Sequence, residues 1–379
     1  MIPLFYPSLN KEKILENLNK TLEDKIIGEG EKVVEFENKV GEFLGNNYSG
    51  NSYYTVAVHS CTAALHLAYI LAGIKKDDEV IVPVLTCTAT THPILWLGAK
   101  PVFADIQPDT LNIDPNDIKK KITKRTKAIV VMHNGGLPCD MDEIKKIAGK
   151  IPIIEDAAQA FGGEYKGKKL GTIGKYGCFS FQAIKALTTG DGGMLVCQNE
   201  RDYKRAKRLR WYSIDREAQK ARGSLVPSKF SELFEQRAMT FDIEETGYKY
   251  NMNNITASIG LANLEKIYEW LKYRKELADL YRQELKDVPG ITLLRDNKGS
   301  SNWLFQILVK NRKDIQEKLG RVGIETNMVQ VRNDIYTIFG GKREELPNMN
   351  QLEFSYISLP INNKVTKEDV LKICQIIKS

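Results

Sequence analysis

Lys185 is the residue in this sequence whose surroundings most suggest chemistry. It follows the aromatic run CFSF, lies among Phe181, Ile184 and Leu187, and precedes a polar, glycine-rich turn at 188–193. Burying an ammonium group is costly and lowers its pKa, so a lysine in such a place can be neutral near pH 7 and form a Schiff base with a carbonyl. The alternative is a surface lysine on a loop between two core strands.

Asp156 supplies a second reactive group at the end of the apolar run PIIED. In a parallel sheet, ligands gather at the carboxyl ends of the strands, and both Asp156 and Lys185 would follow such a strand. A lysine that forms a Schiff base and a carboxylate that faces a protonated ring nitrogen are what pyridoxal phosphate (PLP) requires. The small residues after Asp156 also allow it to be the N-cap of a helix.

A candidate phosphate cradle precedes both residues. The segment His59-Ser60-Cys61-Thr62 follows an apolar run and opens a helix. Free backbone N–H groups at a helix N-terminus bind phosphate, and small hydroxyl residues add donors. Ser180, on the strand before the lysine, could supply another hydroxyl. Many helices begin in this way, but the cradle, the acid and the lysine in this order together indicate a PLP site.

The pattern of apolar runs predicts the elements that position these groups. Strand-like and helix-like stretches alternate from residue 53 to 197, which predicts an α/β fold with a mostly parallel sheet in three layers. Two amphipathic helices are expected within 11–44, and a basic helix at 200–211 followed by an irregular segment at 213–246. We interpret the basic helix as a solvated face, or alternatively as a helix near a phosphate-bearing ligand.

Two domains are predicted. A large cofactor-binding domain covers residues 1–250, and a smaller C-terminal α/β domain covers 251–379. The smaller domain begins with one long helix at 254–286, and Thr366 with Asp369 forms a capping-box pattern before the last helix. Its strands are expected near residues 291–294, 303–309, 324–328 and 354–359.

Composition narrows the class of protein. The 379-residue chain has a net charge of +7, but its acids and bases are mixed along the sequence, which is a weak argument for nucleic acid. Its six cysteines form no CxxC and its four histidines no HExxH, so a zinc site and a metal hydrolase are not expected. The absence of long apolar runs and of a signal-peptide profile predicts a cytoplasmic protein with no membrane partner.

Six segments of the sequence resemble one known family. They read HSCTAAL, PVLTCTATTHPILWLGAKPVFADI, HNGGLPCDMDEI, EDAAQAFGG, FSFQAIKALTTGDGG and GYKYNMNNITASIG. In this order they resemble the DegT/DnrJ/StrS-type nucleotide-sugar aminotransferases, which are fold type I, or aspartate aminotransferase-like, PLP enzymes. The resemblance extends from Gly28 to the final helix and implies the same fold, cofactor and homodimer.

The resemblance implies roles for individual residues. Lys185 would be the Schiff-base lysine, Asp156 would pair with the pyridine nitrogen, and Gln159 would lie near the ring hydroxyl. Ser180 and the backbone around Cys61 and Thr62 would hold the phosphate. Asn251 would reach the phosphate of the neighbouring subunit, so that each active site would need both chains of the homodimer.

The sequence departs from the family pattern at several positions. Cys87 stands where many members place an aromatic residue over the cofactor ring, and Cys61 replaces a glycine. The segment 327–332 lacks a histidine that relatives often carry near the sugar. Arg332 and Asn333 are our candidates for contacts with the nucleotide diphosphate.

The resemblance also implies a reaction. L-Glutamate would donate its amino group, through the cofactor, to a nucleotide-linked keto-sugar, most often a 4-keto-6-deoxyhexose in this family. A 3-keto-sugar is the alternative substrate, and the residues leave the nucleotide open. The rival hypotheses are a different PLP reaction, such as desulfuration or dehydration, and a regulatory or binding protein that keeps the fold without turnover.

Overall fold

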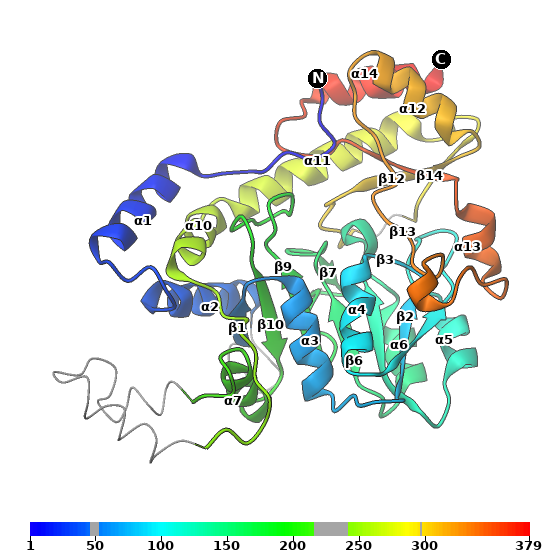
Figure 1. The fold of residues 1–379 in the computed structure, drawn as a ribbon. Helices are drawn as coiled ribbons and strands as arrows, with labels where there is room; N and C mark the ends of the chain where they lie inside the picture. Colours follow the sequence, from blue (N-terminus) through cyan, green and yellow to red (C-terminus); the bar gives the residue numbers. More distant parts are fainter. Residues whose placement is uncertain (46–52, 216–241, 296–297) are drawn as a thin grey trace.

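The protein is built around a seven-stranded sheet (Figure 1). The computed structural model describes residues 1–45, 53–215, 242–295 and 298–379. The strand order is β1-β10-β9-β6-β5-β2-β4, and the pairs from β9 to β4 are parallel, whereas β10 is antiparallel to β1 and β9. The predicted mostly parallel sheet is therefore confirmed. Its strands are β1 (Tyr54–Val58), β2 (Glu79–Pro83), β4 (Lys100–Ala104), β5 (Thr126–Met132), β6 (Ile153–Asp156), β9 (Tyr176–Ser180) and β10 (Gly193–Cys197).

Helices cover both faces of this sheet, because successive side chains of a strand point to opposite faces. In β5, Ala128 and Val130 join one apolar core, whereas Ile129 and Val131 join the other. The first core is closed by α3, α4 and α7, and the second by α2, α5, α6 and α10. These helices are α2 (Glu31–Leu44), α3 (Cys61–Leu71), α4 (Thr88–Trp96), α5 (Pro115–Lys121), α6 (Met141–Ala148), α7 (Glu200–Leu209) and α10 (Asn254–Leu264).

A three-stranded antiparallel sheet forms a third core in the C-terminal part of the chain. The capping box predicted at Thr366 and Asp369 is present at the start of the last helix. The N-terminal segment joins this part, since the backbone of Ile2 is hydrogen-bonded to Gly323 and Glu325. The elements are α11 (Ile267–Leu285), β11 (Ile291–Leu293), β12 (Phe305–Val309), α12 (Arg312–Arg321), α13 (Pro347–Leu352), β14 (Tyr356–Leu359) and α14 (Lys367–Lys378).

Two details of the C-terminal prediction are wrong. The single helix expected at 254–286 is two helices, α10 and α11. They separate because α10 packs against α2 and α1 (Lys11–Glu23), whereas α11 packs against α14. Residues 324–328 form isolated bridges instead of a strand, and the short strand β13 (Val331–Arg332) follows them and pairs with β3 (Leu85–Thr86). The domain boundary at 250/251 stays a prediction.

The basic helix at 200–211 is α7, and carboxylates of the same chain face its cations. Arg205 forms a bidentate ion pair with Glu245. Arg210, which lies just after the helix and is buried, forms ion pairs with Glu29 and Glu37. Lys207 also pairs with Glu37. These contacts favour a structural role for the helix. Most of the irregular segment predicted at 213–246 lies outside the described residues.

Candidate active site

Strand register brings the predicted groups to one edge of the sheet. Val58, Gly193 and Ser180 lie side by side on β1, β10 and β9, and Asp156 at the end of β6 is level with Cys178 on β9. This is the edge at which the parallel strands end, where ligands bind in sheets of this kind. Lys185 follows β9 on the same edge.

The N-terminus of α3 lies directly against this edge. A Cβ atom on Gly193 would lie 2.4 Å from the backbone carbonyl carbon of Ser60, so only glycine permits this approach. Ser60 caps α3, and its hydroxyl accepts a hydrogen bond of 3.2 Å from the Ala63 N–H. The first N–H groups of a helix, here those of Cys61 and Thr62, lack intrahelical partners. With the neighbouring Ser180 hydroxyl they form a donor set that suits a phosphate group.

Asp156 is buried and has three donors around its carboxylate. Thr90 Oγ1 donates to Oδ2 over 2.7 Å, the Ala158 N–H donates to Oδ1 over 3.1 Å, and the Cys61 thiol lies 4.0 Å from Oδ1. Burial raises the pKa of Asp156, although the Thr90 and Ala158 hydrogen bonds and the positive charge of Lys185 oppose this rise. Turns rather than a helix follow, so Asp156 is not a helix N-cap.

The neighbouring acid, Glu155, points to the other side of the strand. Its carboxylate accepts hydrogen bonds from the N–H groups of Gly171, Ile173 and Gly174, and it contacts His133 Nε2 at 3.0 Å. These partners fix the loop before β9. Of the two acids at the end of β6, Asp156 alone is thus available to the candidate site.

Sequence reasoning missed Thr90. Its hydroxyl lies 2.7 Å from the Thr86 hydroxyl and 2.7 Å from Asp156, so the two threonines fix the orientation of the carboxylate. Thr86 ends β3 and Thr90 lies in the first turn of α4, so the short connection between the strand and the helix brings the two hydroxyls together. The threonine-rich run TCTATT was the signal that could have identified them.

Gln159 is held at the same edge by its carbonyl oxygen. Oε1 accepts a 2.7 Å hydrogen bond from the Gly135 N–H, and the side chain is buried. Within the part of the chain that the structure describes, Nε2 has no hydrogen-bond partner. An amide with a free N–H₂ group suits the predicted contact with a ring hydroxyl.

The amine of Lys185 lies inside the site. Nζ is 3.9 Å from the centroid of the Trp303 ring. Burial lowers the pKa of Lys185, and the charge of Asp156 opposes this effect. The lysine and Asp156 therefore lie close enough to act on each other. Trp303, which lies far from Lys185 in the sequence, was not predicted as a site residue.

Two further predicted cofactor residues lie at the rim of the site. Cys87 is exposed at the N-cap of α4. Asn251 forms an isolated bridge with Val58 of its own chain, in line with Gly193 and Ser180. This places Asn251 beside the cradle of its own subunit, and its contact with a neighbouring subunit stays a prediction.

Arg332 and Asn333 have structural partners instead of free donors. The buried guanidinium of Arg332 makes hydrogen bonds of 2.7 and 2.6 Å to the two carboxylate oxygens of Asp334. The amide of Asn333 accepts from the Thr91 hydroxyl and donates to the Thr86 carbonyl. These contacts hold the residues in place, Asn333 against the start of α4, and the nucleotide contact of either residue stays a prediction.

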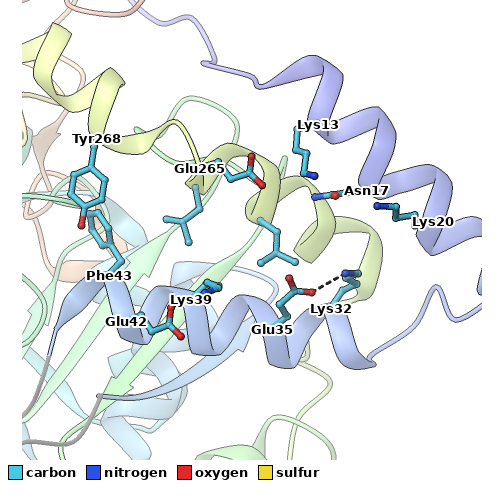
Figure 2. A pocket seen from close by; sticks show the side chains of 12 residues that line it. Lys13, Asn17, Lys20, Lys32, Glu35, Lys39, Glu42, Phe43, Glu265 and Tyr268 are labelled. Carbon is cyan, nitrogen blue, oxygen red and sulfur yellow. Dashed lines mark hydrogen bonds and ion pairs between the residues drawn. The ribbon is translucent and has the colours of Figure 1, made fainter.

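A separate cavity of about 630 Å³ lies between α1, α2 and α10 (Figure 2). Phe43 and Leu261 are among its apolar lining residues, and the Lys32–Glu35 ion pair also lines it. None of its lining residues belongs to the site around Lys185. We assign no reaction to it.

Comparison with known proteins agrees with this geometry. The model of the DegT/DnrJ/EryC1/StrS aminotransferase family matches residues 8–378. The chain belongs to this family. GDP-perosamine synthase of Escherichia coli O157:H7 is 34% identical, with 99% of this chain and 97% of that protein covered. The structure of the sugar aminotransferase CalS13 of Micromonospora echinospora matches with a TM-score of 0.89 at 30% identity, covering 100% of this chain and 99% of that one.

A structure from Streptococcus pneumoniae determined in a PLP-form also matches. Its TM-score is 0.86 at 27% identity, covering 100% of this chain and 97% of that one. The predicted fold type I is thus confirmed, and the protein is a PLP-dependent sugar aminotransferase. The donor set described above fits this cofactor, because an α-helix N-terminus, a buried carboxylate and a buried lysine amine lie at one edge of the sheet.

The close approach at Gly193 can be tested by substitution. Gly193→Ala would force the backbone of Ser60 and Cys61 away from the sheet, so we expect PLP to bind at least about tenfold more weakly, a change of about 1.4 kcal/mol. Gly28→Ala is the matched control, since a Cβ atom added there would have no other atom within 4 Å. Titration of the cofactor-free proteins with PLP measures the affinity of each variant. Equal affinities for Gly193→Ala and wild type would contradict the assigned cradle.

The raised pKa of Asp156 predicts a pH-dependent stability. Because the folded chain holds this proton more tightly than the unfolded chain, ionisation reduces stability as the pH rises from the ordinary value of 3.8 through the raised pKa. In cofactor-free Asp156→Asn, we expect the free energy of unfolding relative to wild type to increase over this range, while PLP affinity falls. Urea unfolding at a series of pH values measures this difference. If the free energy of unfolding changed with pH in the same way in both proteins, Asp156 would not be the group that causes the pH dependence.

Proposed function

We propose that this protein transfers the amino group of L-glutamate to a nucleotide-linked 4-keto-6-deoxyhexose, giving an amino sugar nucleotide. The observation that carries the proposal is the half-buried Lys185 and the buried Asp156 beside the N-terminus of α3. The relatives support the substrate class, since one is named GDP-perosamine synthase and another a UDP-4-amino-4-deoxy-L-arabinose–oxoglutarate aminotransferase. A 3-keto-sugar is the alternative substrate.

The cofactor and the residues of this chain would have different chemical roles in the reaction. When bound, PLP supplies an aldehyde that exchanges amino groups and a ring that accepts electrons. Lys185 would hold the aldehyde group and, when free, would serve as the base that moves a proton at the amino acid carbon. Asp156 would face the ring nitrogen and keep it protonated, and Thr90 would hold the carboxylate in place for this contact. Gln159 would donate to the ring hydroxyl.

The remaining contacts would anchor the cofactor. The Cys61 and Thr62 N–H groups and Ser180 would bind its phosphate, and Cys87 would contact its ring. We propose a homodimer with shared active sites, in which Asn251 extends the phosphate contacts to the second subunit. No nucleic acid partner is proposed.

We further propose a cytoplasmic location. All six cysteines are free in the structure, which suits a reducing compartment. Within the described residues, no helix is long and apolar enough to cross a membrane.

Covalent attachment of the cofactor tests the assignment of Lys185. Borohydride reduction of the PLP-loaded protein should leave the cofactor on the peptide that contains Lys185, as read by mass spectrometry. Lys185→Ala should lose both this adduct and its transaminase activity. Lys175→Ala is the matched control, because Lys175 precedes the same strand but is exposed. An adduct on another lysine in the wild-type protein would refute the assignment.

A substrate panel tests the reaction. The protein is incubated with L-glutamate and UDP-, GDP- or dTDP-linked sugars that carry a keto group at C4 or C3, and product masses are measured. We expect an amino sugar nucleotide and 2-oxoglutarate in equal amounts from one of the 4-keto sugars. Amination of a 3-keto sugar alone would establish the alternative, and turnover of none would contradict the proposed substrate class.

A further inference from the structure

The indole ring of Trp303 makes two contacts with the lysine segment. Lys185 Nζ lies 3.9 Å from the ring centroid, and Trp303 Nε1–H donates a 2.9 Å hydrogen bond to the backbone carbonyl of Ile184. The tryptophan is only 2% exposed. One rigid side chain thus fixes both the backbone next to the lysine and the position of its amine.

Trp303 is itself held from two directions. Phe5 stacks on its ring with a centroid separation of 5.4 Å and an interplanar angle of 26°. The buried Arg274 of α11 donates to the Trp303 carbonyl at 3.4 Å and to the Ile361 carbonyl at 2.7 Å. The segment that carries Phe5 is anchored by Asn362, whose side chain donates to the carbonyls of Pro3 and Leu4. The indole therefore has little freedom to move away from the amine.

An indole face attracts an ammonium group, and more strongly where water is excluded. Aminotransfer requires that Lys185 leave the cofactor while the amino group is being moved, so the chain needs a place for the released amine. We propose that Trp303 is a positioning residue. Its indole ring would hold the released amine of Lys185 within reach of the cofactor. This inference rests on the proposed function of Lys185.

Other charged and titratable groups also act on this amine. They are Asp156 at the end of β6, Cys61 at the start of α3 and Cys87 before α4. The charge of Asp156 and the ring of Trp303 both favour the ammonium form, and burial opposes it. Removing the indole while Asp156 and both cysteines remain should therefore make the amine easier to deprotonate.

The pH dependence of lysine modification provides the test. Full-length, cofactor-free protein is treated with trinitrobenzenesulfonate at increasing pH, and the modified Lys185 peptide is quantified by mass spectrometry. For Trp303→Leu we expect the pH midpoint of Lys185 modification to fall by about one unit. This shift corresponds to the free energy of a cation–π interaction in a partly desolvated site. Trp303→Phe keeps a weaker ring contact but loses the hydrogen bond to Ile184, so its midpoint should lie between those of Trp303→Leu and wild type.

Trp211→Leu is the matched control. Lys249 Nζ lies 3.8 Å from the centroid of the Trp211 ring. This variant therefore removes an indole–lysine contact elsewhere and should leave the Lys185 midpoint unchanged. A tryptophan that only fills space would leave the Lys185 midpoint at its wild-type value in Trp303→Phe, and that result would overturn the inference. If Trp303→Leu does not fold, Trp303→Phe still decides the question. Failure of wild-type protein to trap PLP on Lys185 would instead contradict the proposed function, whatever the midpoints.

Discussion

The site depends on keeping a carboxylate and an amine in a place from which water is largely excluded. Burial makes the charged form of each group less favourable, which raises the pKa of Asp156 and lowers that of Lys185. Their mutual attraction and the hydrogen bonds from Thr90 and Ala158 offset part of this cost. A protonated ring nitrogen beside Asp156 would offset more of it, which is a physical reason for this chain to bind its cofactor firmly.

The local parts of the site could be read from the sequence. Apolar runs ended at Asp156 and before Lys185, and the rule that ligands bind where parallel strands end placed them together. The start of α3 was recognisable from small and hydroxyl residues after an apolar run. These features are local, because a strand, its end and a helix cap each span only a few residues.

The parts that the sequence did not reveal depend on contacts between distant segments. The sequence around Trp303 does not indicate that its ring contacts Lys185, because the two residues are far apart in the chain and only the fold brings them together. The break between α10 and α11 falls at Glu265 and Lys266, which are not helix-breaking residues, and α11 then runs from the second core, which includes Ile267, to the third core, which includes Leu277. The ion pair between Arg332 and Asp334 was likewise not visible in the sequence, because polarity alone does not show which partner a guanidinium has.

The contact at Gly193 has a consequence for motion. Because the backbones of β10 and α3 touch there, α3 cannot shift toward the sheet without displacing β10. The amine end of the site is contacted instead by Trp303, which lies in the segment before β12 of the three-stranded sheet. The two ends of the site thus depend on different parts of the chain, the phosphate end on β10 and α3 and the amine end on the C-terminal part, so a displacement of one part relative to the other would change the distance between them.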